Sequence, residues 1–141
     1  MRNYLIKAVL TLACLALVSV PVPVTAQTSD VGLSIKVLPE TTNPGKTVTL
    51  ASLVTNNTSR KMRTTLTFTS LSACGTEAII GYTRLALEPG QTKFVSGSYT
   101  VPADACLGMY TITISGDSGG GKNSAAASTS APSASAYLSV Q

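Results

Sequence analysis

Residues 43–56 read Asn43-Pro44-Gly45-Lys46-Thr47-Val48-Thr49-Leu50-Ala51-Ser52-Leu53-Val54-Thr55-Asn56, and this stretch decides the fold of the chain. From Val48 to Val54 every second residue is apolar or small, and a period of two places those side chains on one face of a β-strand. Turn-forming residues precede the run at Asn-Pro-Gly and follow it at 56–59. The stretch therefore predicts a half-buried strand with a turn at each end.

The same pattern, a short alternating run between turn residues, occurs six more times along the chain. These runs cover residues 31–37, 62–68, 79–87, 93–101, 109–115 and 136–140. None of them has a helical period, and the abundant Ser and Thr favour strands and hydrated surfaces over helices. Seven short strands joined by turns predict an all-β, seven-stranded immunoglobulin-like β-sandwich.

Two cysteines provide an independent check on this arrangement. In an immunoglobulin-type order, the third strand (62–68) and the sixth (109–115) are antiparallel neighbours in one sheet. Cys74 follows the third strand and Cys106 precedes the sixth, so both lie at the same end of that sheet. We therefore expect a Cys74–Cys106 disulfide, which closes a loop of about 33 residues and stabilises the fold by roughly 3 to 4 kcal/mol.

Residues 1–26 have the features of a cleaved signal peptide. Arg2 and Lys7 flank a short polar start, an apolar run covers residues 8–20, and Val24-Thr25-Ala26 fits the small-residue cleavage pattern. The apolar run is shorter than the roughly 20 residues that cross a bilayer. We therefore expect one mature domain, residues 27–141, that is secreted or periplasmic and does not span a membrane.

The middle of the chain resembles a known kind of module. The segments that carry the resemblance are residues 43–50, 54–56 and 87–92, together with Val101-Pro102 and Gly108-Met109-Tyr110-Thr111-Ile112. Over residues 31 to about 115 the chain is similar to bacterial secreted immunoglobulin-like modules of the cell-adhesion-related (CARDB-like) kind. The shared features are Pro-Gly turns before strands, an Asn at a turn, and a Tyr near the tyrosine-corner position. The resemblance implies the sandwich fold and a role in cell adhesion outside the cell.

The predicted topology also sorts the loops. It places the turns at 56–60 and 88–91 and the segment 116–135 at the pole opposite the disulfide, where a site built from loops is expected. Gly, Ser and Ala make up most of the segment 116–135, which has no periodicity, so we expect a flexible loop. The sequence leaves open whether this loop is functional or merely flexible.

Catalytic chemistry lacks its usual residues in this chain. Gly116-Asp117-Ser118-Gly119-Gly120 is the string around the nucleophilic Ser of trypsin-like proteases, but that mechanism needs a His, and the chain has none. We therefore interpret Ser118 as a loop residue. Two cysteines in a disulfide leave no thiolate ligand, and the six Asp and Glu are scattered. We expect no enzyme activity, no cofactor and no metal site.

Candidate partner-binding residues gather at the turn after the second strand and in the loop that faces it. They are Asn57, Arg60, Lys61, Arg63 and Lys122. One interpretation is a basic surface that contacts only solvent. The more specific one is a surface that contacts an anionic surface or a polysaccharide. Without the leader the charge of the chain is nearly balanced, which argues against nucleic acid as a partner. Aromatic residues are few, and we expect most of them in the core rather than on a sugar-binding platform.

Two functions from different classes follow. The leading one is a non-catalytic secreted or periplasmic binding or structural module that contacts a protein or cell-wall partner through its loops or a sheet edge. Strand addition at the edge strands 31–37 or 79–87 is the favoured mechanism. The alternative is a secreted proteinase-inhibitor-like or enzyme-regulating domain whose 116–135 loop enters a partner's cleft, which requires a rigid loop. The sequence determines neither the partner nor the oligomeric state.

Overall fold

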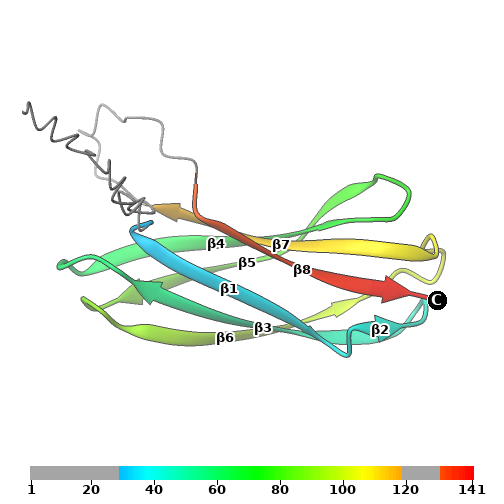
Figure 1. Ribbon diagram of the computed structural model, residues 1–141, viewed down its shortest axis with the longest axis horizontal. Helices are drawn as coiled ribbons and strands as arrows, with labels where there is room; N and C mark the ends of the chain where they lie inside the picture. Colours follow the sequence, from blue (N-terminus) through cyan, green and yellow to red (C-terminus); the bar gives the residue numbers. More distant parts are fainter. Residues whose placement is uncertain (1–28, 119–130) are drawn as a thin grey trace, which may run out of the picture.

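A computed structural model describes residues 29–118 and 131–141, and this part of the chain is built from β-strands (Figure 1). The strands are short and follow one another through turns. They are β1 (Val31–Leu38), β2 (Thr41–Thr42), β3 (Thr47–Asn56), β4 (Met62–Leu71), β5 (Glu77–Leu87), β6 (Thr92–Thr100), β7 (Gly108–Ser118) and β8 (Ser133–Val140).

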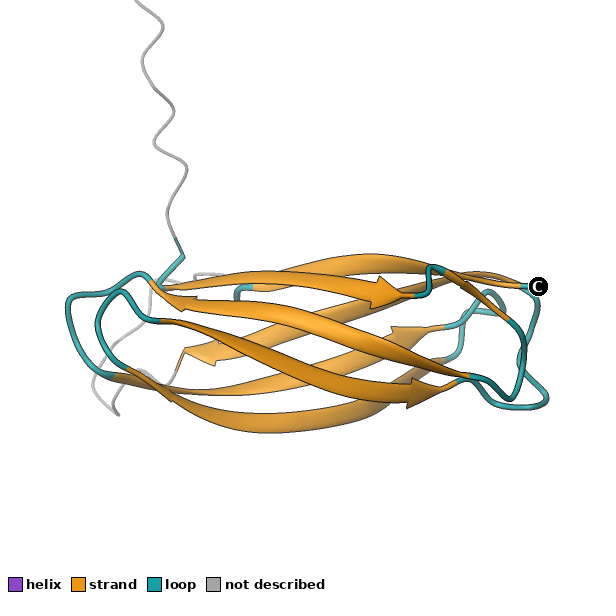
Figure 2. Ribbon diagram, turned by 90° about the horizontal axis from the view of Figure 1, so that it is seen from below, coloured by secondary structure: helices purple, strands orange, loops and turns teal. Residues whose placement is uncertain are grey.

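Two sheets pack face to face as a sandwich, and the turns lie at its two ends (Figure 2). One sheet has the order β1-β3-β6 and the other has the order β2-β8-β7-β4-β5. As predicted for the third and sixth runs of the sequence, β4 and β7 are antiparallel neighbours. The immunoglobulin-like sandwich expected from the alternating pattern is therefore confirmed.

The structure has eight strands in its described part, where the sequence predicted seven. The additional strand is β2, whose Thr41 and Thr42 pair in parallel with Ser139 and Val140 of β8. Residues 39–45 have the composition of a turn, and two residues are too few to show an alternating pattern. The strands β7 and β8 also reach into the segment 116–135 predicted as a loop, while residues 119–130 lie outside the described part.

The core lies between the sheets and is formed by the inward residues of the alternating runs. Val48, Leu50 and Val54 of β3 are buried, as the fold-deciding stretch predicts. Ser52 shares their face and is 1% exposed, and its Oγ has no hydrogen-bond partner within the described residues. Leaving a buried hydroxyl unpaired costs about 1 to 3 kcal/mol.

Two Pro-Gly turns set the direction of the strands that follow them. Gly45 and Gly90 have φ angles of 77° and 69°, a left-handed conformation that glycine adopts without steric cost. Lys46 N donates to Asn43 O, and Gln91 N donates to Glu88 O, which closes each turn. A proline followed by a glycine with positive φ is typical of type II turns.

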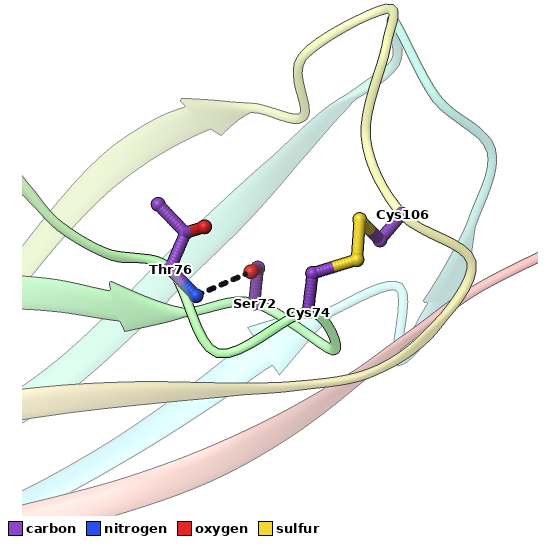
Figure 3. Close-up of a disulfide and its surroundings, with 4 residues drawn as sticks. All are labelled: Ser72, Cys74, Thr76 and Cys106. Carbon is purple, nitrogen blue, oxygen red and sulfur yellow. Dashed lines mark hydrogen bonds between the residues drawn. A yellow bond between two sulfur atoms is a disulfide. The ribbon is translucent and has the colours of Figure 1, made fainter.

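Cys74 and Cys106 form the predicted disulfide, with their Cα atoms 6.1 Å apart (Figure 3). Cys74 lies in the turn between β4 and β5, where Thr76 N donates to Ser72 Oγ at 3.0 Å. The bond joins this turn to the segment before β7, so it holds one pole of the sandwich. A disulfide of this kind indicates an extracytoplasmic, oxidising compartment. The predicted signal peptide, residues 1–26, lies outside the described residues.

Among residues 29–118 and 131–141, no helix has the length and apolar character needed to cross a membrane.

Candidate functional site

The pole opposite the disulfide is organised by Asn56, whose side chain is fully buried. Its Nδ2 donates to the backbone oxygens of Arg60 at 2.7 Å, Leu87 at 3.2 Å and Glu88 at 3.1 Å. Its Oδ1 accepts from the backbone N and the Oγ1 of Thr58. One side chain thus joins the β3–β4 turn to the end of β5, and it fixes how β4 and β5 leave this pole.

Two of the predicted binding residues also contribute to this local structure. Asn57 Nδ2 donates to Ser29 O at 2.9 Å, and Asn57 N donates to Asp30 O, so the residue attaches the start of the domain. Lys61 Nζ forms an ion pair with Glu88 at 2.6 Å across the two turns. The side chains of Lys61 and Glu88 are both exposed. Exposed ion pairs of this kind contribute little to stability. Their predicted role in partner binding stays a prediction.

Of the other three predicted residues, two lie in the described part of the chain. Arg60 is exposed on the turn itself, whereas Arg63 is exposed on β4. Because successive residues of a strand point to opposite faces, Arg63 lies on the outer face while its neighbour Thr64 is buried. Lys122 lies outside the described residues. Arg63 is thus placed on the broad outer face of the five-stranded sheet.

That outer face is lined by hydroxyl groups. Outward residues of β4 and β7 face each other in register, and β8 continues the rows. The hydroxyl residues are Thr65, Thr67, Thr69, Thr111, Thr113, Ser115, Ser133 and Ser135. Thr113 Oγ1 and Ser135 Oγ share a hydrogen bond of 2.9 Å. The face therefore offers many small donors and acceptors on a pleated, solvent-accessible surface.

Large side chains border this hydroxyl face on two sides. On β5, Tyr82 is 76% exposed and Ile79 is 72% exposed, and on β8 Tyr137 is 63% exposed. Only Phe68 and Tyr110 are buried among the aromatic residues of the described part. The expectation that most aromatic residues lie in the core is therefore wrong, and two exposed tyrosines belong to the outer face.

Among the described strands, β5 is a free edge of the five-stranded sheet. Lys93 Nζ, from the neighbouring sheet, donates to Ala86 O at 2.7 Å, so the backbone of Ala86 points away from β4. Consecutive residues of an antiparallel strand direct their backbone groups to opposite sides. By this alternation Tyr82 and Arg84 also direct N–H and C=O to the free edge, while Thr83 is bonded to β4.

A β-bulge interrupts the alternation in the same strand. Phe68 pairs with Gly81 and Thr69 pairs with Ile79, so Ile80 has no partner on β4. Ile80 packs against the core, and the extra residue lets Ile79 and Tyr82 both remain exposed. The consecutive Ile79-Ile80 followed by Gly81 is a sequence signal for such a bulge, because a glycine inside a strand often marks one.

A pocket of about 350 Å³ opens beside this face, at the β4–β5 end nearer to Asn56. Arg63 and Thr65 of β4, Arg84 of β5 and Asp117 of β7 all line it. Arg84, Thr65 and Asp117 form one row across three strands. Neither arginine takes part in an ion pair with another described residue. Two guanidinium groups against one carboxylate give the pocket a net positive charge.

Tyr110 lies near the tyrosine-corner position expected from the sequence, and it is only 3% exposed. Burial raises the pKa of Tyr110, because the charged phenolate is poorly solvated there. Nearby Tyr99 and Asp104 add to the increase, and a hydrogen bond with the backbone of Cys106 opposes it. A hydroxyl bonded to the backbone four residues upstream is typical of a tyrosine corner. Tyr110 therefore has a structural role at the disulfide pole.

A catalytic or metal-binding arrangement does not emerge from these residues. The chain has no His, and the described part contains no group of three or more Cys, Asp or Glu that could hold a metal ion. Gly116 and Asp117 of the protease-like string belong to β7, where they pair with Leu66 and Thr65. Ser118 is the last residue of that strand, where the sequence predicted a loop.

Comparisons with known proteins agree on the fold. No family model matches the chain, and no curated protein matches it. Among solved structures, the chain is similar to the CARDB domain of a Pyrococcus furiosus protein in complex with di-metal ions, at a TM-score of 0.60 and 20% identity. The match covers 79% of this chain and 88% of that domain. The resemblance to CARDB-like modules is thus confirmed for the fold.

Two enzymes contain a part with the same fold. One is the alkylpurine DNA glycosylase AlkC of Pseudomonas fluorescens, bound to DNA with an abasic site analog, at a TM-score of 0.61 and 10% identity. The other is a β-glucosidase of Listeria innocua in complex with isofagomine, at a TM-score of 0.59 and 12% identity. About 80% of this chain matches, but the match covers only 31% and 16% of those chains. Their activities belong to much longer proteins, and these likenesses show the fold alone.

Proposed function

We propose that this protein is a non-catalytic binding module of the extracytoplasmic space, which holds an extended segment of a partner protein at the free edge of β5. One observation carries the proposal. The residues whose backbone groups face this edge, Tyr82 and Arg84, lie in an eleven-residue edge strand beside the exposed Ile79. The disulfide supports a location outside the cytoplasm.

Strand addition accounts for each feature of this edge. Backbone hydrogen bonds to a new strand supply affinity, and the side chains at alternate positions supply specificity. Natural sheets usually protect long free edges with charges, bulges or covering segments. Here Lys93 covers the edge at Ala86 and the bulge interrupts it at Ile80, which leaves the part between them open.

The other predicted edge is less suited to strand addition. Strand β1 is at the edge of the three-stranded sheet, but it also contacts β7 and β8 of the opposite sheet. In contrast, β5 and β6 make few contacts with each other. The open side of the sandwich is therefore the side of β5.

Three variants test the mechanism. Tyr82→Pro removes an N–H that faces the free edge and leaves the bonds to β4, whereas Thr83→Pro removes one of those bonds and should lower stability. Tyr82→Ala keeps the N–H and removes only the side chain. Each variant is used for crosslinking capture from the cell envelope, with thermal unfolding as the check on folding.

We expect the same partner to be captured by the wild type and, more weakly, by Tyr82→Ala, and to be lost with a folded Tyr82→Pro. Capture by Tyr82→Pro at the wild-type level would contradict strand addition at β5. The alternative role as a proteinase-inhibitor-like or enzyme-regulating domain depends on the segment 116–135. Because residues 119–130 of that segment lie outside the described part, this role stays a prediction.

A further inference from the structure

We infer that the pocket formed by Arg63, Arg84 and Asp117, together with the ring of Tyr82, is a binding site for the uronic acid units of an acidic polysaccharide. The charged part of this site includes Arg63 of β4, whereas the proposed strand addition depends on the free backbone groups of β5. The two can therefore be tested separately.

The charge of the pocket points to a carboxylate ligand. Arg63 faces Ala86 and Arg84 faces Thr65, so the two arginines are diagonal neighbours on adjacent strands. Diagonal neighbours lie about 7 to 8 Å apart, which lets long side chains converge on one group. A planar guanidinium binds a carboxylate through two parallel hydrogen bonds. With no ion-pair partner among the described residues, both arginines keep these donors for a ligand.

The surroundings of the arginines point to a sugar. Tyr82 lies two residues from Arg84 on the same face, about 7 Å along the strand, a distance that one pyranose ring with its carboxylate can bridge. The C–H groups of a sugar ring pack on an aromatic face, and Tyr82 is 76% exposed. Asp117 and the hydroxyl rows offer acceptors and donors for sugar hydroxyl groups.

Other anionic partners fit this site less well. Nucleic acids and anionic membranes are bound by extended basic surfaces. Here a single carboxylate already offsets one of the two arginines in the pocket. A neutral polysaccharide would leave the net positive charge of the pocket without a counter-charge. An acidic polysaccharide supplies both the separate carboxylates and the rings that this face can hold.

Affinity electrophoresis with three polyuronates (polygalacturonate, alginate and hyaluronate) tests the site. Methyl-esterified polygalacturonate has the same rings without the charge, and polyglutamate has the charge without the rings. Arg63→Gln/Arg84→Gln removes the pocket charges, and Tyr82→Ala removes the ring. The matched controls are Lys36→Gln and Phe94→Ala, at exposed positions on the three-stranded sheet. Thermal unfolding confirms that each variant is folded.

We expect the wild type to bind at least one polyuronate, with affinity reduced at least about tenfold in the double arginine variant and about threefold or more in Tyr82→Ala. The two controls should change the affinity less than about twofold. Binding to none of the three polyuronates would overturn the inference. The inference would also be overturned if the methyl ester or polyglutamate bound as tightly as the polyuronate. A loss of affinity in the control variants as large as in the site variants would overturn it too. Protein capture at β5 should survive Arg63→Gln, which keeps the two proposals distinguishable.

Discussion

Replacing Asn56 should destabilise the domain far more than replacing its neighbour Asn57. Asn56 is fully buried, and its amide donates to three backbone carbonyls from two different turns. Asn57 is exposed, and within residues 29–118 and 131–141 its amide donates to one carbonyl. Asn56 and Asn57 are adjacent and of the same type, so they provide a matched pair. They differ in burial and in the number of hydrogen bonds.

The size of the effect follows from the hydrogen bonds. A typical one contributes about 1 kcal/mol net, and the loss is larger where a buried partner is left unpaired. The bond to Leu87 O is fully buried, while those to Arg60 O and Glu88 O are partly exposed and regain water. We therefore expect Asn56→Ala to lower the free energy of unfolding by about 3 to 4 kcal/mol. For Asn57→Ala we expect less than about 1 kcal/mol.

A third variant tests whether the side chain at position 56 must donate hydrogen bonds. Asn56→Asp keeps an acceptor for Thr58 but turns a negatively charged carboxylate toward three carbonyl oxygens. At neutral pH it should be less stable than Asn56→Ala, because buried charge without a donor is costly. Urea unfolding followed by circular dichroism measures all three. Equal losses for Asn56→Ala and Asn57→Ala, or an Asn56→Asp variant as stable as wild type, would refute this reasoning.

Three further predictions concern the disulfide and the core. Reduction of Cys74–Cys106, or replacement of both by Ala, should lower the unfolding free energy by about 3.7 kcal/mol, the chain-entropy value for a loop of about 33 residues. Urea unfolding with and without reductant measures it, and a change below about 1 kcal/mol would contradict that model. Ser52→Ala should raise stability by about 1 kcal/mol in the same assay, because the buried Oγ has no partner among the described residues; a loss of stability would show that the hydroxyl is satisfied. The raised pKa of Tyr110 means that the unfolded chain releases this proton first, so the wild type should lose stability relative to Tyr110→Phe as the pH rises above about 10, and not below. Unfolding curves between pH 8 and 11 check this, and a parallel pH dependence of both proteins would contradict it.

The sandwich could be predicted because burial imposes the period of each strand. Val48, Leu50 and Val54 alternate in the sequence since one face of β3 meets the core. The pairing of Cys74 with Cys106 followed from the order of the strands. Strand β2 could not be predicted, because its two residues are held by pairing with β8 and leave no pattern of their own.

The candidate site was only partly predictable for a related reason. Arg60, Lys61 and Arg63 are close in the sequence and suggested one basic cluster. The sequence does not show that Lys61 pairs with Glu88 or that Arg63 lies on the outer face of the five-stranded sheet. The residues that join Arg63 in the pocket come from β5 and β7, and only the strand register brings them together. No local pattern in the sequence carries that information.

The proposed binding sites lie apart from the contacts that hold the two poles of this fold. Hydrogen bonds of Asn56 hold one pole and the disulfide holds the other. The outer face of the five-stranded sheet lies between them, and its exposed Ile79 and Tyr82 sit on an edge strand. Exposed apolar side chains on a free edge favour aggregation, and the bulge and Lys93 protect only parts of this one. A bound strand or polysaccharide would cover the open part, so either partner should make the protein more soluble as well as more stable.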